Sequence, residues 1–219
     1  MRYYTIIYKG TLKGESGESC NSKYDLQNAC RECGTNAQLV GNLIAKGISS
    51  VNLDFFQTFD RDYVISERLF NFLKMKKIKL GSLLKIIDTK GKEMSFYHFN
   101  SKLSFPKATN KTTGLKTERQ CGVCKRDGYF NDMMYQETKD GIKKIYTHIH
   151  FVFENIKNDY LKTSDIFVTW EHIGLSNLQA EGIRVIRYAR PMLLVSDHIK
   201  MAFEEYGVKN ITFEKVEIN

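Results

Sequence analysis

The sequence predicts an α+β fold in which a mixed or antiparallel sheet is combined with a few helices. Three observations lead to this prediction. Short runs rich in β-branched and aromatic residues are typical of strands, serine-initiated apolar patterns mark helices, and one such helix pattern occurs twice along the chain. With 219 residues, 42% of them hydrophobic and 26% charged, the chain has the composition of one globular domain, so we expect a single domain over residues 1–219.

The first half of the chain alternates strand and loop patterns around one helix. Gly, Ser, Asn and Cys are frequent in residues 10–38, which predicts a loop. Residues 66–76 predict a helix because Ser66 is placed to cap it and Leu69 and Leu73 share one apolar side. Strands are predicted at 2–8, near 51–57, at 83–88 and at 94–99.

The second half begins with a polar, basic segment, residues 107–128, and continues as a predicted hairpin. Its strands, 132–138 and 143–154, would turn through Lys139-Asp140-Gly141. Period-two alternation places His148 and His150 on one face, where two imidazoles can hold a metal. No third ligand is nearby in sequence, so we expect a partly exposed strand face instead. His98 is expected at the edge of the core and Trp170 within it.

An internal repeat relates residues 64–80 (VISERLFNFLKMKKIKL) to residues 194–213 (LVSDHIKMAFEEYGVKNITF). At an offset of 130 residues, Ser66 aligns with Ser196 and each serine is followed by an acidic residue, which favours the positive end of a helix. The repeat predicts two duplicated strand–helix–strand units in related lobes, about 1–105 and 130–219; chance similarity between two capped helices is the alternative. In either case the serines are helix caps rather than nucleophiles.

Five cysteines carry the strongest chemical signal. Two CxxC pairs can complete a tetrahedral shell of four sulfurs around one Zn²⁺, whereas an odd count without a secretory signal argues against a disulfide framework. We therefore predict a structural zinc site in a ribbon-like knuckle module, formed by about 28–35 and 119–128, that joins the lobes. Iron accepts the same ligands. A dithiol redox site at 121–124 and unliganded thiols are the alternatives, and Cys20 is expected to be a spare thiol. The predicted ligands are Cys30, Cys33, Cys121 and Cys124.

The net charge and the absence of catalytic motifs limit the classes of function that the sequence supports. A formal charge of +8 favours an acidic partner, although scattered lysines alone would also produce it. The chain has no GxSxG, P-loop, dinucleotide-binding or HExxH motif and pairs no nucleophile with a base, so we predict that it is not an enzyme. No run approaches the roughly 20 apolar residues of a membrane span. We expect a cytoplasmic protein without membrane contact.

Taken together, these motifs resemble the double-CxxCG motif immunity proteins of bacteria. The resemblance rests on the opening strand, the two Cys pairs and the closing segment 164–216, although Lys125 stands where the motif has its second glycine. It implies a protein that binds and neutralises a cognate antibacterial toxin, with the four cysteines as zinc ligands. At +8 we expect that toxin to be neutral or acidic at the docking face. The alternative is a nucleic-acid-binding zinc-ribbon protein, suggested by the charge and by aromatic strands such as 94–99.

Overall fold

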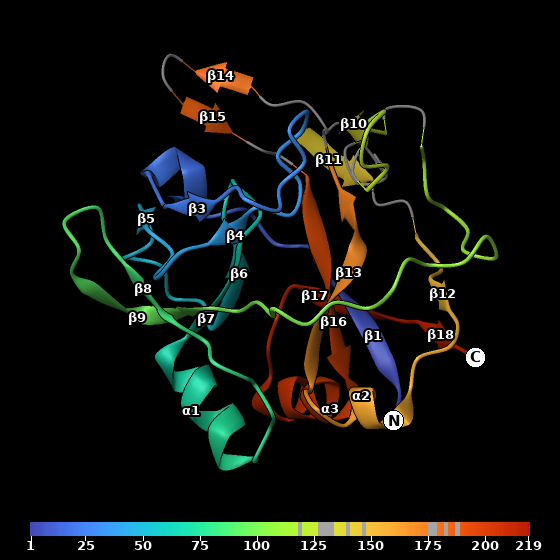
Figure 1. The fold of residues 1–219 in the computed structure, drawn as a ribbon. Helices are drawn as coiled ribbons and strands as arrows, with labels where there is room; N and C mark the ends of the chain where they lie inside the picture. The colour runs from blue at the N-terminus through green and yellow to red at the C-terminus, as the bar shows by residue number, and fades with distance from the viewer. Residues whose placement is uncertain are drawn as a thin grey trace.

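The computed structural model describes residues 1–117, 120–126, 134–138, 141–145, 148–174, 179–181, 184–186 and 189–219. Within them the fold is α+β, as predicted, with few helices and several antiparallel sheets (Figure 1). The helices are α1 (Glu67–Met75), α2 (Asn158–Leu161), α3 (Asp197–Tyr206) and the short 3-10 helix η1 (Gly17–Cys20). No helix in the described part of the chain is both long enough and apolar enough to cross a membrane.

Two four-stranded sheets form the body of the protein. In the first, the strand order is β6 (Phe55–Gln57), β7 (Tyr63–Ser66), β9 (Glu93–His98), β8 (Lys85–Ile87). In the second it is β13 (Ile166–Ile173), β16 (Arg190–Ser196), β1 (Tyr3–Tyr8), β17 (Ile211–Lys215). Every neighbouring pair in both sheets is antiparallel.

Five two-stranded ladders surround these sheets. The antiparallel ones are β2 (Glu15–Ser16) with β5 (Ala45–Lys46), β3 (Tyr24–Asp25) with β4 (Gln38–Leu39), β10 (Met134–Thr138) with β11 (Gly141–Ile145), and β14 (Gln179–Glu181) with β15 (Arg184–Ile186). The fifth, β12 (Val152–Phe153) with β18 (Glu217–Ile218), is parallel.

The two large sheets share one plan. In each, the strand before the helix is second in order, the strand after the helix lies at one edge, and a further strand is inserted between them. That inserted strand is β9 in the first sheet and the N-terminal strand β1 in the second. The division into lobes at about 1–105 and 130–219 stays a prediction, but β1 itself belongs to the sheet otherwise built from residues 166–215.

The shared plan extends to side chains at the start of each helix. Ser66 Oγ donates a hydrogen bond of 2.5 Å to Asp54, and Ser196 Oγ donates one of 2.5 Å to Asp165. Each serine N–H also binds the backbone oxygen of the same aspartate. Ser66 Oγ in addition accepts from Leu69 N, as expected of a cap, whereas Ser196 makes no such side-chain bond. The serines therefore hold each helix to the strand that begins beside it.

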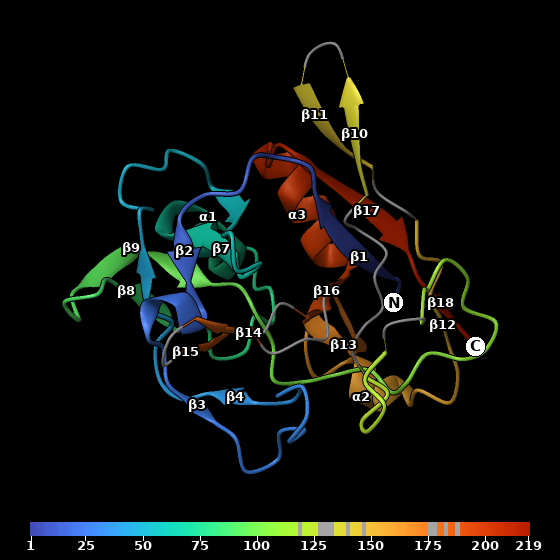
Figure 2. The ribbon, with the colours of Figure 1, turned by 90° about the horizontal axis from the view of Figure 1, so that it is seen from above.

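One core lies between the two sheets and the helices α1 and α3, which lie next to each other in both views (Figures 1 and 2). A second core covers the opposite face of the β13–β16–β1–β17 sheet and includes Phe151, Phe153 and Leu161. Side chains along β16 point alternately to the two cores: Leu193 and Val195 face the first core and Leu194 faces the second. This sheet is therefore buried on both faces.

Some predicted boundaries were wrong. The expected strand near 51–57 is formed only at β6, and the loop 10–38 contains η1 and the short strands β2 and β3. The hairpin exists as β10 and β11, but its second strand does not run through 143–154, since residues 148 and 149 are outside any strand and β12 pairs with β18 instead. Apolar alternation there reflects packing into the second core, where Ile149, Phe151 and Phe153 are buried.

Candidate metal centre

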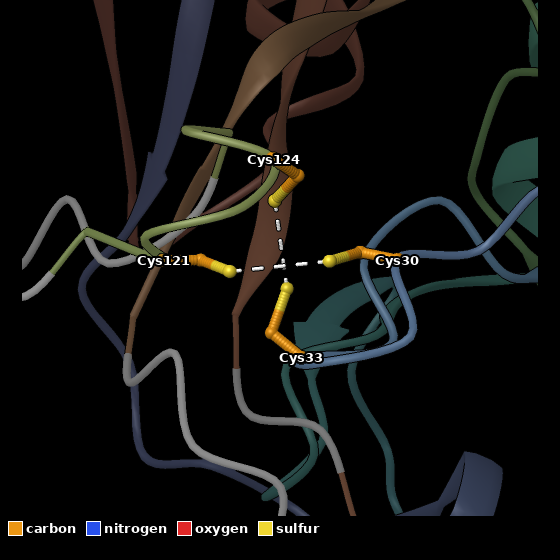
Figure 3. A group of neighbouring side chains, drawn as sticks. All are labelled: Cys30, Cys33, Cys121 and Cys124. Atoms are coloured by element: carbon orange, nitrogen blue, oxygen red, sulfur yellow. Dashed lines mark hydrogen bonds between the residues drawn. The ribbon is translucent and has the colours of Figure 1, made fainter.

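Four sulfurs converge at the junction between the first loop region and the second large sheet. The Sγ atoms of Cys30, Cys33, Cys121 and Cys124 all lie within 4.8 Å of one another (Figure 3). Cys30 Sγ is 3.9 Å from Cys121 Sγ, and Cys33 Sγ is 3.5 Å from Cys124 Sγ. A tetrahedral shell with metal–sulfur bonds of about 2.3 Å separates its sulfurs by about 3.8 Å. The cluster is therefore placed to hold a metal ion, and all five cysteines are free of disulfides.

The first knuckle is built by the turn that follows Cys30. Gly34 N donates to Cys30 O at 2.7 Å, and Cys30 N donates to Thr35 O at 2.8 Å. Gly34 has φ +69°, a conformation that glycine adopts without steric cost. The Thr35 hydroxyl lies 3.2 Å from Cys33 Sγ, where it can hydrogen-bond the sulfur. The backbone of this turn thus sets the directions of the Cys30 and Cys33 side chains.

The second knuckle makes the same turn without a glycine. Lys125 N donates to Cys121 O at 3.2 Å, and Lys125 takes φ +56°. A residue with a side chain pays roughly 1–2 kcal/mol for this conformation. The longer hydrogen bond and the positive φ of Lys125 make this turn less favourable than the first, as expected where a lysine replaces glycine. Neither Lys125 nor Arg126 begins a helix, unlike the arrangement that activates a CxxC thiol in redox proteins.

Strand β13 receives the second knuckle at a bulge. Its pairing with β16 shifts register between Val168 and His172. His172 N donates to Arg126 O at 2.8 Å, and Arg126 Nε donates to Trp170 O at 3.1 Å. The Arg126 guanidinium also lies 5.1 Å from the centre of the Trp170 ring. Trp170 is half-buried and anchors the knuckle to the sheet, rather than filling the core as predicted.

Arg126 also ties the two knuckles together. Its Nη1 donates to Asn36 Oδ1 at 3.0 Å, and Asn36 follows the first knuckle with φ +74°. Sequence reasoning missed this residue, because nothing in the local pattern distinguishes it from the neighbouring basic residues. Its position directly after a CxxC turn is the one signal that could have identified it.

Burial and hydrogen bonding shift the pKa of the Cys30 thiol in opposite directions. Burial alone would raise the pKa of Cys30, but hydrogen bonds from the Cys33 and Glu32 backbone outweigh burial, and its pKa lies below the ordinary value. The thiolate is the form that binds a metal. Cys20, by contrast, is outside the cluster and buried, which together with the charge of Asp60 raises its pKa to about 11. The pKa shifts of Cys30, which belongs to the cluster, and Cys20, which does not, therefore have opposite directions.

The predicted histidine positions lie elsewhere. His148 and His150 do not form a metal pair among the described residues; instead they contact Glu214 and Glu217, respectively. His98 is nearly buried at the end of β9, with Nε2 3.6 Å from Asp62 Oδ1, which matches its expected place at the edge of the core.

Glu171, in the β13 bulge, is a buried acid that provides a pH-dependent test of this anchoring region. Its Oε1 accepts from Ala108 N at 2.7 Å, while Oε2 has no hydrogen-bond partner among the described residues. Burial raises the pKa of Glu171 above 4.5. A raised folded-state pKa stabilises the protein below the unfolded value and loses that contribution as pH rises through the folded value.

We therefore expect Glu171→Gln to gain stability relative to the unsubstituted protein as the pH rises from about 4 to about 7. Thermal unfolding of both proteins across this range measures the difference. Glu93→Gln, at an exposed position on β9, is the matched substitution outside the bulge. A difference between Glu171→Gln and the unsubstituted protein that is the same at both ends of the range would contradict the expectation.

No protein-family model matches the chain, and no curated protein matches it. The four cysteines and their geometry are thus the direct indication of function: a cluster of four sulfurs, contributed by two distant segments, that is placed to bind one metal ion.

Proposed function

We propose that this is a non-catalytic binding protein, acting in the bacterial cytoplasm, in which the four cysteines hold a structural Zn²⁺ and whose target is a cognate protein toxin. The observation that carries the proposal is the convergence of Cys30 and Cys33 with Cys121 and Cys124, 91 residues away along the chain. An ion at this point joins two segments that are also linked by the hydrogen bond from Arg126 to Asn36. Its contribution is to folding.

Zinc is the ion that the ligand set favours. Four thiolates with near-tetrahedral spacing suit Zn²⁺, and a shell of four protein ligands leaves no open position for water or substrate. Such a centre stabilises a fold and does not catalyse hydrolysis or proton transfer. The cysteines fit this role because they are half-buried or buried and their turns are fixed by backbone hydrogen bonds.

A toxin as the target follows from the resemblance of the sequence to double-CxxCG motif immunity proteins, and the charge refines it. At +8 the protein attracts a target with an acidic docking face and repels a basic nuclease over long range. The aromatic rings of β9 argue against the nucleic-acid alternative. Tyr97 is stacked on Phe70 with ring centres 3.9 Å apart, and Phe96 packs on Phe56 in the core, so both rings are already occupied by protein contacts.

Two measurements test the proposal. Elemental analysis of the purified protein should find one equivalent of zinc. Co-expression with the product of the adjacent gene should protect the cell and yield a stable complex. If there is neither protection nor complex, the toxin assignment fails while the zinc assignment stands. If instead the protein binds nucleic acid with an affinity that falls steeply with salt, the nucleic-acid alternative replaces it.

A further inference from the structure

A cavity of about 150 Å³ lies beside the metal centre, at the place where the knuckles meet both large sheets. Its walls come from the residues after the first knuckle, the end of β9, the β13 bulge and the start of β16. Each knuckle contributes a residue that follows its second cysteine closely in sequence, Asn36 after Cys33 and Arg126 after Cys124. The lining residues that matter below are Asn36, Asp62, His98, Lys102, Arg126 and Arg190.

The charges in this wall are mostly positive. Asp62 is the one acid that lines the cavity within the described residues, and it is already engaged: its Oδ2 accepts from Ser16 Oγ at 2.7 Å and its Oδ1 faces His98. Arg190 is paired with Glu18 at 2.7 Å. The lining acid Asp62 and the lining cation Arg190 therefore have internal partners, and two further cations remain to be explained. One of these, Arg126, has the buried Glu171 within electrostatic reach, but Glu171 does not line the cavity.

Arg126 and Lys102 are those cations. The side-chain hydrogen bonds of Arg126 go to neutral oxygens, those of Asn36 and Trp170, and no ion pair joins it to a carboxylate in the described part of the chain. Lys102 is exposed at the rim and makes no ion pair with any described residue. The two Arg126 bonds engage Nε and Nη1, and Nη2 has no hydrogen-bond partner among the described residues, so a charged N–H remains for an oxyanion. The Asn36 contact fixes the direction of the guanidinium.

We propose that this cavity is a binding site for a carboxylate group, recognised by Arg126 with Lys102 at the rim. The size fits: a cavity of this volume holds a group of about six heavy atoms and is well below the range of pockets that enclose larger ligands. A singly charged carboxylate is favoured over doubly charged phosphate, because Asp62 and the thiolates of the metal centre lie close to the cavity and repel additional negative charge.

The carboxylate has two chemical sources, a small free acid or an acidic side chain of a bound protein. The site is defined by this chain alone, so its test needs no partner, and its failure would leave the proposed toxin target untouched. Butyrate and N-acetyl-glutamate α-amide carry similar carboxylate arms, but only the second has backbone amides next to it. A site that takes only a small acid should therefore bind butyrate alone, whereas a site that admits a protein side chain should bind both compounds.

Amide NMR shifts of the zinc-loaded protein, titrated with butyrate, N-acetyl-glutamate α-amide and inorganic phosphate, test the proposal. We expect saturable shifts with butyrate around residues 36, 62, 98 and 126. Equal binding of the amide assigns the site to a partner's acidic side chain, and binding of butyrate alone assigns it to a small acid. Arg126→Gln should weaken binding by about tenfold, the value of one charge-assisted hydrogen bond.

Two further variants distinguish a loss of binding from misfolding of the Arg126→Gln protein. Lys102→Gln changes only an exposed rim residue and should weaken binding by a factor of about two to three, a modest surface-charge effect. Arg68→Gln, an exposed arginine on α1, is the matched control and should bind as the unsubstituted protein does. No saturation by about 100 mM butyrate, tighter binding of phosphate, or unchanged binding in both Arg126→Gln and Lys102→Gln would overturn the proposal.

Discussion

Cys33→Ser is expected to abolish metal binding and to lower the free energy of unfolding by about 4 kcal/mol, the linkage contribution when free zinc is about a thousandfold above its dissociation constant. Cys33 is buried, lies 3.5 Å from Cys124 Sγ and is contacted by Thr35, so a serine hydroxyl cannot replace its sulfur in the shell. Urea unfolding with and without added zinc measures the loss. Removing the metal from the unsubstituted protein with a chelator should produce the same loss.

Cys20→Ser is the matched control. Cys20 is buried like Cys33 but lies outside the four-sulfur cluster. We expect this variant to keep one equivalent of zinc and to lose about 1 kcal/mol, at the low end of the cost of burying a hydroxyl, because polar groups of Lys46 and Asp60 already lie near the thiol. If Cys33→Ser retained its zinc, or if the chelator left the unfolding curve unchanged, the centre would not be a structural metal site.

The sequence predicted the elements that depend on local chemistry. Cys30-x-x-Cys33-Gly34 specifies its own turn, and Ser66 and Ser196 stand at the first turns of helices because a polar residue before an apolar helical pattern is a local signal. The sequence also indicated which four of the five cysteines come together, because the CxxC spacing pairs four of them and leaves Cys20 without a partner. These features need only a few neighbouring residues to form.

Features that depend on distant partners were not predictable. Nothing in residues 2–8 shows that β1 inserts between β16 and β17, because a strand with apolar residues on both faces fits the middle of any sheet. The β13 bulge, which receives Arg126, arises from pairing with β16 and has no local motif. The same holds for Asp54 and Asp165, whose equivalence appears only when strand order and hydrogen bonds are compared.

Asp165→Ala is expected to destabilise the protein by about 3–5 kcal/mol, because two buried donors lose their acceptor and each costs about 1–3 kcal/mol when left unpaired. The Asp165 carboxylate is almost fully buried and accepts hydrogen bonds from Ser196 Oγ at 2.5 Å and from Lys79 N at 2.7 Å. His198 lies 3.3 Å from it as a third contact. Alanine would leave the serine hydroxyl and the Lys79 amide buried without an acceptor.

Asp54→Ala is the comparison that the duplicated plan provides. Asp54 makes the equivalent bond to Ser66 and a 3.2 Å ion pair with Arg68, which stands at the position that His198 has in the other unit. Its side chain is 25% exposed, so water can replace the lost acceptor. We expect a loss of about 1–2 kcal/mol. Urea unfolding of both variants decides the point: equal losses would mean that neither burial nor the additional hydrogen bond from Lys79 N sets the cost of losing the carboxylate.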